Sequence, residues 1–418
     1  MIIDLMIMDS IQRHSTTKKN LVVLDDVDSL AQLEELCGAC KHAGPGSNII
    51  VTRRDKHVLN SRMVGKIYEV QTWSSGKSLE LFCSYAFRET HPQKGYEDLS
   101  NRVVNYAGGV PLALEVLGKA LYSRNIGFWV SELEKLENCP QDKIQKVLQV
   151  SYDELDSLLQ KEMLLDIAFF FKGENKDDII RVFDACKFYP TSGLEVLQDK
   201  ALISISNSGK IEMHDLIQEM CLNVVRQGIK HPRKRSRLRD VEEVIDVLED
   251  KKGNDKVEGI ELDLSQLVHD LHLHADTFDK MTSLRILKLY TSLGNRSGIV
   301  HYPDMLNKLS NKLRYLEWNG CGLKRLPASF CAKMLVDIRM PHSHVTELWS
   351  GVQDVGNLVR IDLRECKQLE NVPDLSKASN LKWVNLSGCE KLQDVHSILS
   401  SDTLETLILD GLQESQES

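Results

Sequence analysis

Two adjacent carboxylates, Asp25 and Asp26, follow an unbroken apolar run from Leu21 to Leu24. Such a run predicts a strand that is buried on both faces, as in a parallel sheet. Ligands bind at the carboxyl ends of parallel strands, where a carboxylate can hold Mg²⁺ beside nucleotide phosphates. A plainer interpretation is a solvated turn whose carboxylates cap a helix beginning at Ser29. This stretch alone does not decide between the two.

The neighbouring segments alternate between strands and helices. Apolar spacing predicts a helix over residues 30–37, which a Gly-Pro-Gly turn ends. A second buried strand over residues 48–52 leads into Arg53 and Arg54, and residues 67–70 predict a third strand. Parallel pairing would bring the two arginines to the same edge as Asp25. The strand-helix-strand order is typical of α/β folds.

A Gly-Lys-Ser sequence at residues 76–78 looks like the end of a phosphate-binding loop. That loop requires glycine at its first position, where this chain has Gln71, and it should precede the acidic strand rather than follow it. We interpret the sequence as a helix start in which a serine satisfies free N–H groups. No other glycine-rich phosphate loop occurs in the sequence.

Helical periodicity dominates residues 78–199, and Pro111 is placed to open a helix after the Gly108-Gly109 breaker. Two short strands then flank an Asn-Ser-Gly turn and predict a hairpin, after which Asp215 is placed to cap a helix. Helices closed by a hairpin resemble a winged-helix module.

Six basic residues lie between Lys230 and Arg239. A nuclear-localisation or nucleic-acid-binding role is one interpretation. We favour a solvated linker between domains, because no aromatic residues interleave the charges to stack on bases.

Beyond Val257 the chain repeats an apolar pattern. Units such as Leu313-x-x-Leu316-x-Trp318 recur in one phase, with first residues separated by 22, 23, 23 and 23 positions. Cysteine follows the last apolar position by three residues in three units. This is the leucine-rich repeat pattern, whose units bury their Leu-x-Leu side chains in a shared stack.

The intervening side chains should point outward and form a concave surface. Mixed charge with aromatic residues suits a protein partner better than a nucleic acid, although a solvated sheet face without a ligand is the alternative. The candidate protein-binding residues are Tyr315, Glu317, Arg339, Arg360, Asp362, Arg364 and Trp383.

Composition limits the remaining possibilities. The chain has 418 residues, 42% hydrophobic and 27% charged, so we expect a soluble protein of several domains. A net charge of −9 argues against extensive nucleic-acid binding. No apolar run is long enough to span a membrane, and ten dispersed cysteines are typical of a reducing compartment. We therefore expect a cytoplasmic location, with the nucleus as the alternative.

Several motifs together resemble a known family. The ordered motifs of plant NB-ARC proteins match Leu21 to Val27, Gly46 to Asp55, Gly109 to Leu114 and Met213 to Asp215, and residues 164–171 match a motif of receptors that carry a TIR domain. With the repeats, the resemblance covers nearly all of residues 18–410. The chain resembles a plant TIR-NB-LRR disease-resistance protein that has lost its front end.

The resemblance implies an immune receptor with a signalling switch, held off by ADP and turned on by exchange for ATP with slow hydrolysis. It implies that Asp25 binds Mg²⁺ through water, that Asp26 helps to activate the hydrolytic water and that Arg54 senses the terminal phosphate. Pro111 would pack on adenine. His214 would contact the β-phosphate of ADP, although an ordinary hinge histidine is the alternative.

The sequence also departs from the family. Arg53 stands where a second threonine is usual, and neither a TIR domain nor a P-loop is present. We therefore expect no NAD-cleaving enzyme activity and impaired nucleotide binding, since no lysine and N–H groups surround the phosphates. Residues 67–70 would lose a neighbouring strand, which residues 2–8 could replace. The alternatives are an active ATPase and a nucleotide-free scaffold or decoy.

The expected fold is multidomain, and the repeats are expected to bind a pathogen effector or a guarded host protein. Its expected parts are a partial α/β nucleotide-binding domain at 1–74, a helical domain at 75–138, a winged-helix domain at 139–229, a basic linker and helix at 230–256, and an α/β leucine-rich repeat solenoid at 257–418.

Overall fold

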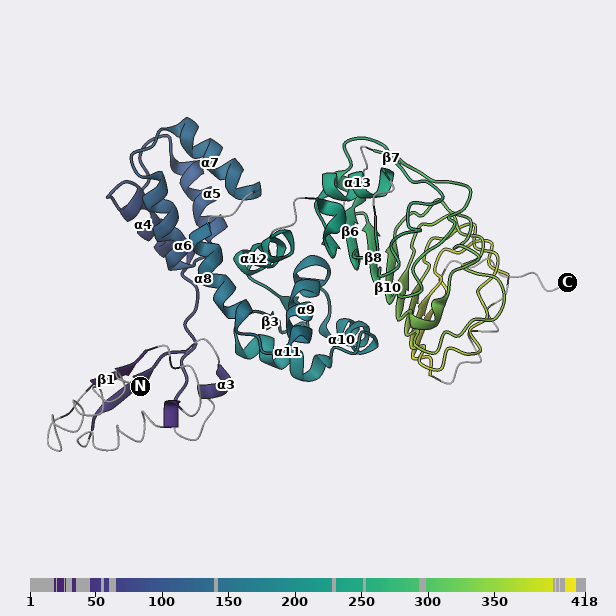
Figure 1. Ribbon diagram of the computed structural model, residues 1–418, viewed down its shortest axis with the longest axis horizontal. Helices are drawn as coiled ribbons and strands as arrows, with labels where there is room; N and C mark the ends of the chain where they lie inside the picture. The colour runs from purple at the N-terminus through teal and green to yellow at the C-terminus, as the bar shows by residue number, and fades with distance from the viewer. Residues whose placement is uncertain are drawn as a thin grey trace. The chain divides into compact units, whose positions relative to one another are not determined.

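Strands and helices follow the sequence periodicities, from an N-terminal strand pair to a long parallel sheet (Figure 1). The computed structural model describes residues 19, 21–25, 27, 32–34, 46–53, 56–59, 65–138, 142–227, 231–250, 253–292, 298–393, 395, 398 and 403–410. They belong to two units, one of Met1–Leu164, Thr191–Ser206 and Glu212–Met220, the other of Leu165–Pro190, Asn207–Ile211 and Cys221–Ser418.

The strands β1 (Leu21–Leu24) and β2 (Asn48–Val51) pair in parallel, as predicted. The prediction that they are buried on both faces is wrong, because 66% of Leu21 and 48% of Ile50 are exposed. A parallel sheet buries its strands only when further strands and helices cover it, and the described residues supply a two-stranded sheet here.

Other expectations for this region have mixed outcomes. Residues 67–70 form no strand, which contradicts the prediction, and 81% of both Tyr68 and Val70 is exposed. An extended segment without a pairing partner cannot complete its backbone hydrogen bonds as a strand. Most of the helix expected over residues 30–37 lies outside the described residues, as do residues 2–8. A short helix, α3 (Lys56–Leu59), follows β2.

A group of helices follows and has its own core. Trp129 is fully buried there, with Nε1 donating to the Leu121 carbonyl at 3.1 Å, and Phe82 packs edge-on against its ring. Pro111 opens its helix, as predicted. The helices are α4 (Ser75–Ala86), α5 (Glu97–Ala107), α6 (Pro111–Leu121), α7 (Ile126–Asn138) and α8 (Asp142–Asp153).

The next segment has the predicted order of helices, hairpin and helix. One helix passes into a π-helical turn whose side chains are all buried, and the two-residue strands of the hairpin form a two-stranded sheet. The elements are α9 (Leu158–Asp166), η1 (Ile167–Phe171), α10 (Lys176–Ala185), α11 (Pro190–Asp199), β3 (Ser204–Ile205), β4 (Ile211–Glu212) and α12 (Asp215–Arg226).

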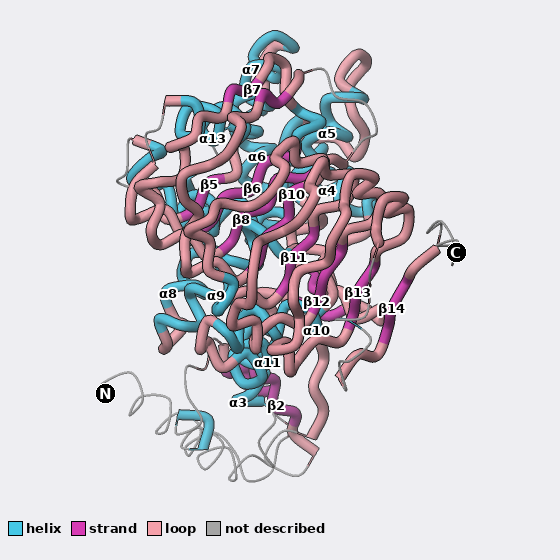
Figure 2. Tube along the Cα trace, turned by 90° about the vertical axis from the view of Figure 1, so that its right-hand side faces the viewer, coloured by secondary structure: helices cyan, strands magenta, loops and turns pink. Residues whose placement is uncertain are grey.

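The C-terminal part is built on an eight-stranded parallel sheet in the order β14-β13-β12-β11-β10-β8-β6-β5 (Figure 2). Its register matches the predicted repeat phase, since Leu316 lies opposite Ile338 and Ile338 opposite Ile361. The strands are β5 (Arg237–Leu238), β6 (Gly259–Asp263), β8 (Ile286–Tyr290), β10 (Tyr315–Trp318), β11 (Asp337–Arg339), β12 (Arg360–Asp362), β13 (Trp383–Asn385) and β14 (Thr406–Ile408).

Shorter elements complete the repeats. A second parallel pair joins two strands away from the main sheet, and one α-helix precedes the first repeat. These elements are η2 (Pro232–Lys234), α13 (Val241–Glu249), η3 (Leu264–Gln266), β7 (Leu271–His272), β9 (Val300–His301) and η4 (Ala332–Met334).

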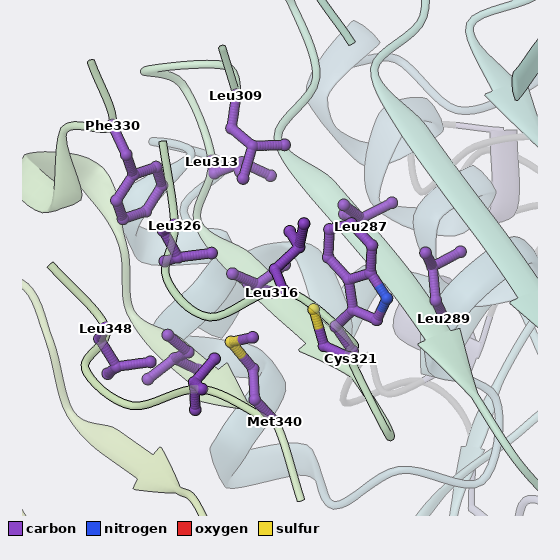
Figure 3. Packing of buried hydrophobic residues seen from close by; sticks show 14 of the residues in the cluster. Leu287, Leu289, Leu309, Leu313, Leu316, Cys321, Leu326, Phe330, Met340 and Leu348 are labelled. Atoms are coloured by element: carbon purple, nitrogen blue, oxygen red, sulfur yellow. The ribbon is translucent and has the colours of Figure 1, made fainter. Parts of the chain in front are cut away.

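The repeat core stacks one apolar layer per unit, and Figure 3 shows Leu287 of β8, Leu316 of β10 and Met340, which directly follows β11, within this core. The three recurring cysteines are fully buried. The thiol of Cys366 donates to the Met340 carbonyl at 3.1 Å, and that of Cys389 donates to the Leu363 carbonyl at 3.2 Å. The thiols thereby add hydrogen-bond donors to carbonyl groups inside the stack, where the Leu363 carbonyl also accepts from the Cys366 amide at 3.2 Å.

Candidate functional site

The edge of the β1–β2 pair brings together the residues that end the two strands. The hydroxyl of Thr52 donates to Asp25, and the Thr52 amide donates to the Leu24 carbonyl at 2.9 Å. Asp25 is exposed. An exposed carboxylate in this position fits a hydrated Mg²⁺ ion, which usually retains several waters. The paired candidates Asp26 and Arg54 lie outside the described residues.

Arg53, the departure from the family pattern, has a structural role. Its guanidinium donates to the carbonyl of Val27, and Val27 donates its amide to the Thr52 carbonyl at 3.2 Å. Arg53 therefore joins the segment after β1 to the segment after β2 by a hydrogen bond. A second threonine at this position could not span that distance.

The Gly108-Gly109 turn positions Pro111. Gly108 has a φ of 55° and ends α5 as a left-handed cap, and Gly109 has a φ of 78°. An added Cβ would lie 2.5 Å from Nε2 of His214 at the first glycine and 2.5 Å from the Trp73 carbonyl oxygen at the second. The turn therefore accepts no side chain at either position.

His214 lies against this turn, at the start of α12. Its Nδ1 accepts a hydrogen bond from the Leu216 amide at 3.2 Å, so this nitrogen carries no proton. The proton of the neutral ring is consequently on Nε2, which donates to the Gly108 carbonyl at 3.1 Å. His214 thus caps α12, a role that the sequence had assigned to Asp215, the first residue of the helix.

A cavity of about 470 Å³ lies beside His214. The positively charged Lys56 lines this cavity. Four carboxylates line it as well, and their negative charges repel a diphosphate. Among the described residues, no group of three or more His, Cys, Asp or Glu side chains could hold a metal ion. The carboxylates are Glu69, Glu195, Asp199 and Glu212.

The concave face of the repeats is partly covered by its own chain. Tyr315 is only 1% exposed, because the ring of Phe171 packs against it edge-on at 5.6 Å and the Arg339 guanidinium lies 5.2 Å from the centre of its ring. The expectation that Tyr315 lies on an open surface is therefore wrong. Its hydroxyl donates to Glu317 at 2.8 Å, and burial raises the pKa of that carboxyl.

Two carboxylates at the start of α10 neutralise the neighbouring cations of the sheet. Glu174 lies 3.1 Å from Nζ of Lys288 and 3.7 Å from Arg339, and Asp178 lies 3.3 Å from Arg360. The pKa of Glu174 is raised by burial, but Lys288 and Arg339 outweigh this effect and hold it below its usual value. Arg339 and Arg360 are thus already paired within the chain.

The later strands leave more of the expected surface accessible. The side chain of Arg364 is 52% exposed and lies 3.8 Å from the buried Asp362. Trp383 is half-buried, with the Arg360 guanidinium 4.0 Å from the centre of its ring. Of the expected protein-binding residues, Arg364 is therefore the one that is exposed, and Trp383 is part-buried.

Sequence reasoning missed one buried charge cluster. Asp166 is inaccessible to solvent and accepts from Arg237 Nε at 2.7 Å and from Arg285 Nη2 at 3.0 Å. Burial opposes ionisation, but the two arginines outweigh it, so the pKa of Asp166 is lowered. The sequence signal that could have revealed this cluster was an acidic residue, Asp166, inside an apolar run. The prediction of a solvated basic linker is wrong for Arg235 and Arg237, which are 8% and 2% exposed.

Three family models match the chain, in the order in which the sequence predicts the nucleotide-binding, winged-helix and leucine-rich-repeat parts. The NB-ARC domain matches residues 3–92, the winged-helix domain described as "Disease resistance protein Roq1-like" matches residues 158–228, and a Leucine Rich Repeat matches residues 335–353. The chain is similar to disease-resistance proteins and carries NB-ARC, winged-helix and leucine-rich-repeat matches in that order, which confirms the expected resemblance and fold class.

The relatives are plant proteins. Disease resistance protein RPV1 of Vitis rotundifolia is 39% identical over 385 residues, covering 87% of this chain and 27% of the relative. Disease resistance protein RUN1 of the same species is 38% identical, covering 87% and 29%, and Disease resistance protein TAO1 of Arabidopsis thaliana is 36% identical, covering 88% and 31%. The chain spans about a third or less of the length of these relatives. Among the described residues, no helix is both long and apolar enough to cross a membrane.

Proposed function

We propose that the chain is part of an intracellular immune receptor that works as an ADP/ATP-dependent switch in plant defence. The observation that carries the proposal is the junction of Gly108 and His214. It joins the turn before Pro111 to the start of α12, within a chain that matches NB-ARC and winged-helix models. A histidine in this position can respond to whatever occupies the space beside Pro111.

The proposed residue roles follow the family. Asp25 would bind Mg²⁺ through water, Asp26 would assist the hydrolytic water and Arg54 would sense the terminal phosphate. Pro111 would pack on adenine and His214 would reach the β-phosphate. The exposure of Asp25 and the closeness of His214 to the Pro111 turn support these roles. The domain limits expected from the sequence likewise remain proposals.

Nucleotide binding by this chain alone should be weak. Its sequence holds no glycine-rich loop to surround the phosphates, and the cavity beside His214 is acidic. Purified chain should therefore release far less than one equivalent of adenine nucleotide on denaturation, as quantified by chromatography. Stoichiometric ADP would contradict weak binding, and its loss on His214→Ala would then assign the histidine to the site.

Two other functions remain as alternatives. An active ATPase would turn over ATP at a measurable rate that falls on Asp25→Ala, whereas a switch with a weak site should show turnover near background in both proteins. A nucleotide-free scaffold or decoy would bind its partner equally well with and without ADP. The rate assay and the binding assay therefore separate the alternatives from the proposal.

We further propose that the repeats bind a pathogen effector or a guarded host protein. The accessible Arg364 and Trp383 favour the later strands as the contact surface, because Arg339 and Arg360 are engaged by Glu174 and Asp178. With a candidate partner in hand, Arg364→Ala and Trp383→Ala should each weaken binding. The exposed Lys280→Ala serves as the control, and equal binding by all three variants would contradict this surface.

A further inference from the structure

Three large apolar side chains are exposed where α6 ends and α7 begins. Tyr122, Ile126 and Phe128 are between 37% and 46% exposed. The core of the same helical group, around Trp129, is by contrast buried. Single exposed apolar side chains are normal, whereas several together are typical of a surface that another molecule covers. The segment from Tyr122 to Phe128 is therefore a candidate contact surface.

A guanidinium lies over each of the two exposed rings. Cζ of Arg88, which follows α4, lies 4.9 Å from the centre of the Tyr122 ring, and Cζ of Arg124 lies 4.8 Å from the centre of the Phe128 ring. These residues come together because α4 and α6 pack side by side (Figure 1). We call this set the arginine–aromatic surface, which consists of Arg88, Tyr122, Arg124, Ile126 and Phe128.

Neither of these arginines has a carboxylate partner among the residues that the structure describes. Lys119 provides the contrast in the same helical group, because its ammonium lies 5.2 Å from the centre of the Tyr85 ring and is also paired with Glu115, one turn earlier. A guanidinium carries five N–H donors, which a ring face leaves for water or a ligand. The donors of Arg88 and Arg124 are therefore open to a carboxylate from outside the chain.

The local structure does not explain the two arginines. Arg88 lies near the end of α4, where a cation is favourable, but its φ of 59° is in the left-handed region that favours glycine after a helix. Arg124 precedes α7 by two residues, and the partial positive charge at the start of a helix disfavours a cation there. Side chains that break such local rules are expected at surfaces that serve a contact.

The chemistry of the surface fits an acidic protein segment better than a nucleic acid. One face of each exposed ring is covered by a guanidinium, which leaves less ring surface to stack on bases. Ile126 adds aliphatic area that has no π-face. A segment that carries carboxylates beside large apolar side chains would instead match both the unpaired charges and the exposed apolar area.

We propose that the arginine–aromatic surface binds a partner protein through a segment of this kind. Carboxylates of the segment pair with Arg88 and Arg124, and its apolar side chains cover Ile126 and the two rings. The surface contains none of the residues assigned above to nucleotide or to the partner of the repeats. It is therefore a second contact surface, and it does not rest on the proposed function.

A labelled peptide that alternates glutamate and leucine tests the proposal on the full chain by fluorescence polarisation. This peptide should bind, and a matched peptide that alternates glutamine and leucine should bind about tenfold more weakly, because its carboxylates are gone. Three results would each overturn the proposal. They are no binding of the glutamate peptide, equal binding of both peptides, and tighter binding of oligothymidine than of the glutamate peptide.

Variants of the surface test the assigned residues. Arg88→Gln and Arg124→Gln should each weaken binding of the glutamate peptide about threefold, as expected for one exposed ion pair, and this effect should shrink as salt is added. Ile126→Ser should weaken binding at every salt concentration, because it removes apolar area. Lys77→Gln, in the first turn of α4, is the matched control. Equal binding by Arg124→Gln and Lys77→Gln would overturn the assignment.

Arg88→Gly separates the contact from stability. Glycine relieves the left-handed backbone, so the melting temperature should not fall, whereas peptide binding should weaken as in Arg88→Gln. A lower melting temperature with unchanged peptide binding would overturn the role of Arg88 in the contact. Arg364→Ala, in the repeats, should bind the peptide like the original chain, so this test fails separately from the proposed function of the repeats.

Discussion

At the scale of single residues, the chain uses buried charges to fix long-range contacts. Asp166 receives two arginines that lie 71 and 119 positions away in sequence. A buried carboxylate is stable only when such partners satisfy it. The position of these arginines is therefore as constrained as that of any core leucine.

Asp166→Asn should lower the free energy of unfolding by about 3–5 kcal/mol, because it removes the buried counter-charge of Arg237 and leaves Arg285 paired with Glu258. Urea unfolding followed by circular dichroism measures the change. Asp304→Asn, at an exposed position, should change stability by less than about 0.5 kcal/mol. A similar small change for Asp166→Asn would show that the cluster is not needed.

Glu219 should make stability depend on pH near neutrality. Burial raises the pKa of this carboxyl to about 7, whereas its ordinary value is 4.5. Between these values the folded state holds a proton that the unfolded state has released, so stability should fall as the pH rises from 4.5 to about 7. Glu219→Gln keeps an acceptor for Tyr106 and should remove this fall.

Thermal unfolding of both proteins across this pH range provides the measurement. An identical pH profile for the original chain and Glu219→Gln would mean that Glu219 titrates normally.

At the scale of elements, the sequence predicted what is local and periodic. The repeat phase, the helix opened by Pro111 and the hairpin before α12 all depend on neighbours within a few residues, and all are confirmed. The burial of Tyr315 was not predictable in this way. The residues that cover it, Phe171 and Arg339, come from another element and another repeat.

In the candidate site, too, local features were predicted from the sequence and tertiary contacts were not. The spacing of motifs placed Asp25 at a strand edge and Pro111 at a helix start. It could not show that His214 donates to Gly108, because that bond depends on how α12 packs on α5, 106 positions away. Nor could it predict the exposure of β1 and β2, since a strand pattern presumes that covering elements are present.

Lys288→Met should destabilise the contact between η1 and β8. The Lys288 ammonium donates to the Phe170 carbonyl and to Glu174, each at 3.1 Å, so its loss removes a donor from both acceptors and leaves Glu174 with Arg339 at 3.7 Å. We expect a loss of about 1–3 kcal/mol in the free energy of unfolding. The exposed Lys280→Met is the matched control, and equal stabilities of the two variants in urea would contradict the assigned role.

At the scale of the whole molecule, the parts of the chain differ in how completely they bury their apolar side chains. The repeats and the helical group have extensive buried cores, whereas β1 and β2 leave apolar side chains exposed. The chain spans about a third or less of the length of the plant relatives that it matches. Because β1 and β2 carry this exposed apolar surface, the strand-edge residues that we propose to bind nucleotide lie in the part of the chain with the least buried core.

Asp25→Ala should leave ATP turnover near background, as we also expect for the original chain, because its sequence holds no glycine-rich loop to surround the phosphates. Phosphate release measured with enzyme in large excess over contaminants provides the readout. A clear drop from a measurable rate would contradict this expectation and favour the ATPase alternative.

The central claim is that the junction of Gly108 and His214 responds to nucleotide. Hydrogen exchange of the chain with millimolar Mg·ADP, high enough to fill a weak site, tests this most directly. The account predicts altered exchange at the turn of residues 108–110 and at the start of α12, with no such change in Asp25→Ala. Identical exchange with and without ADP at every concentration would contradict it.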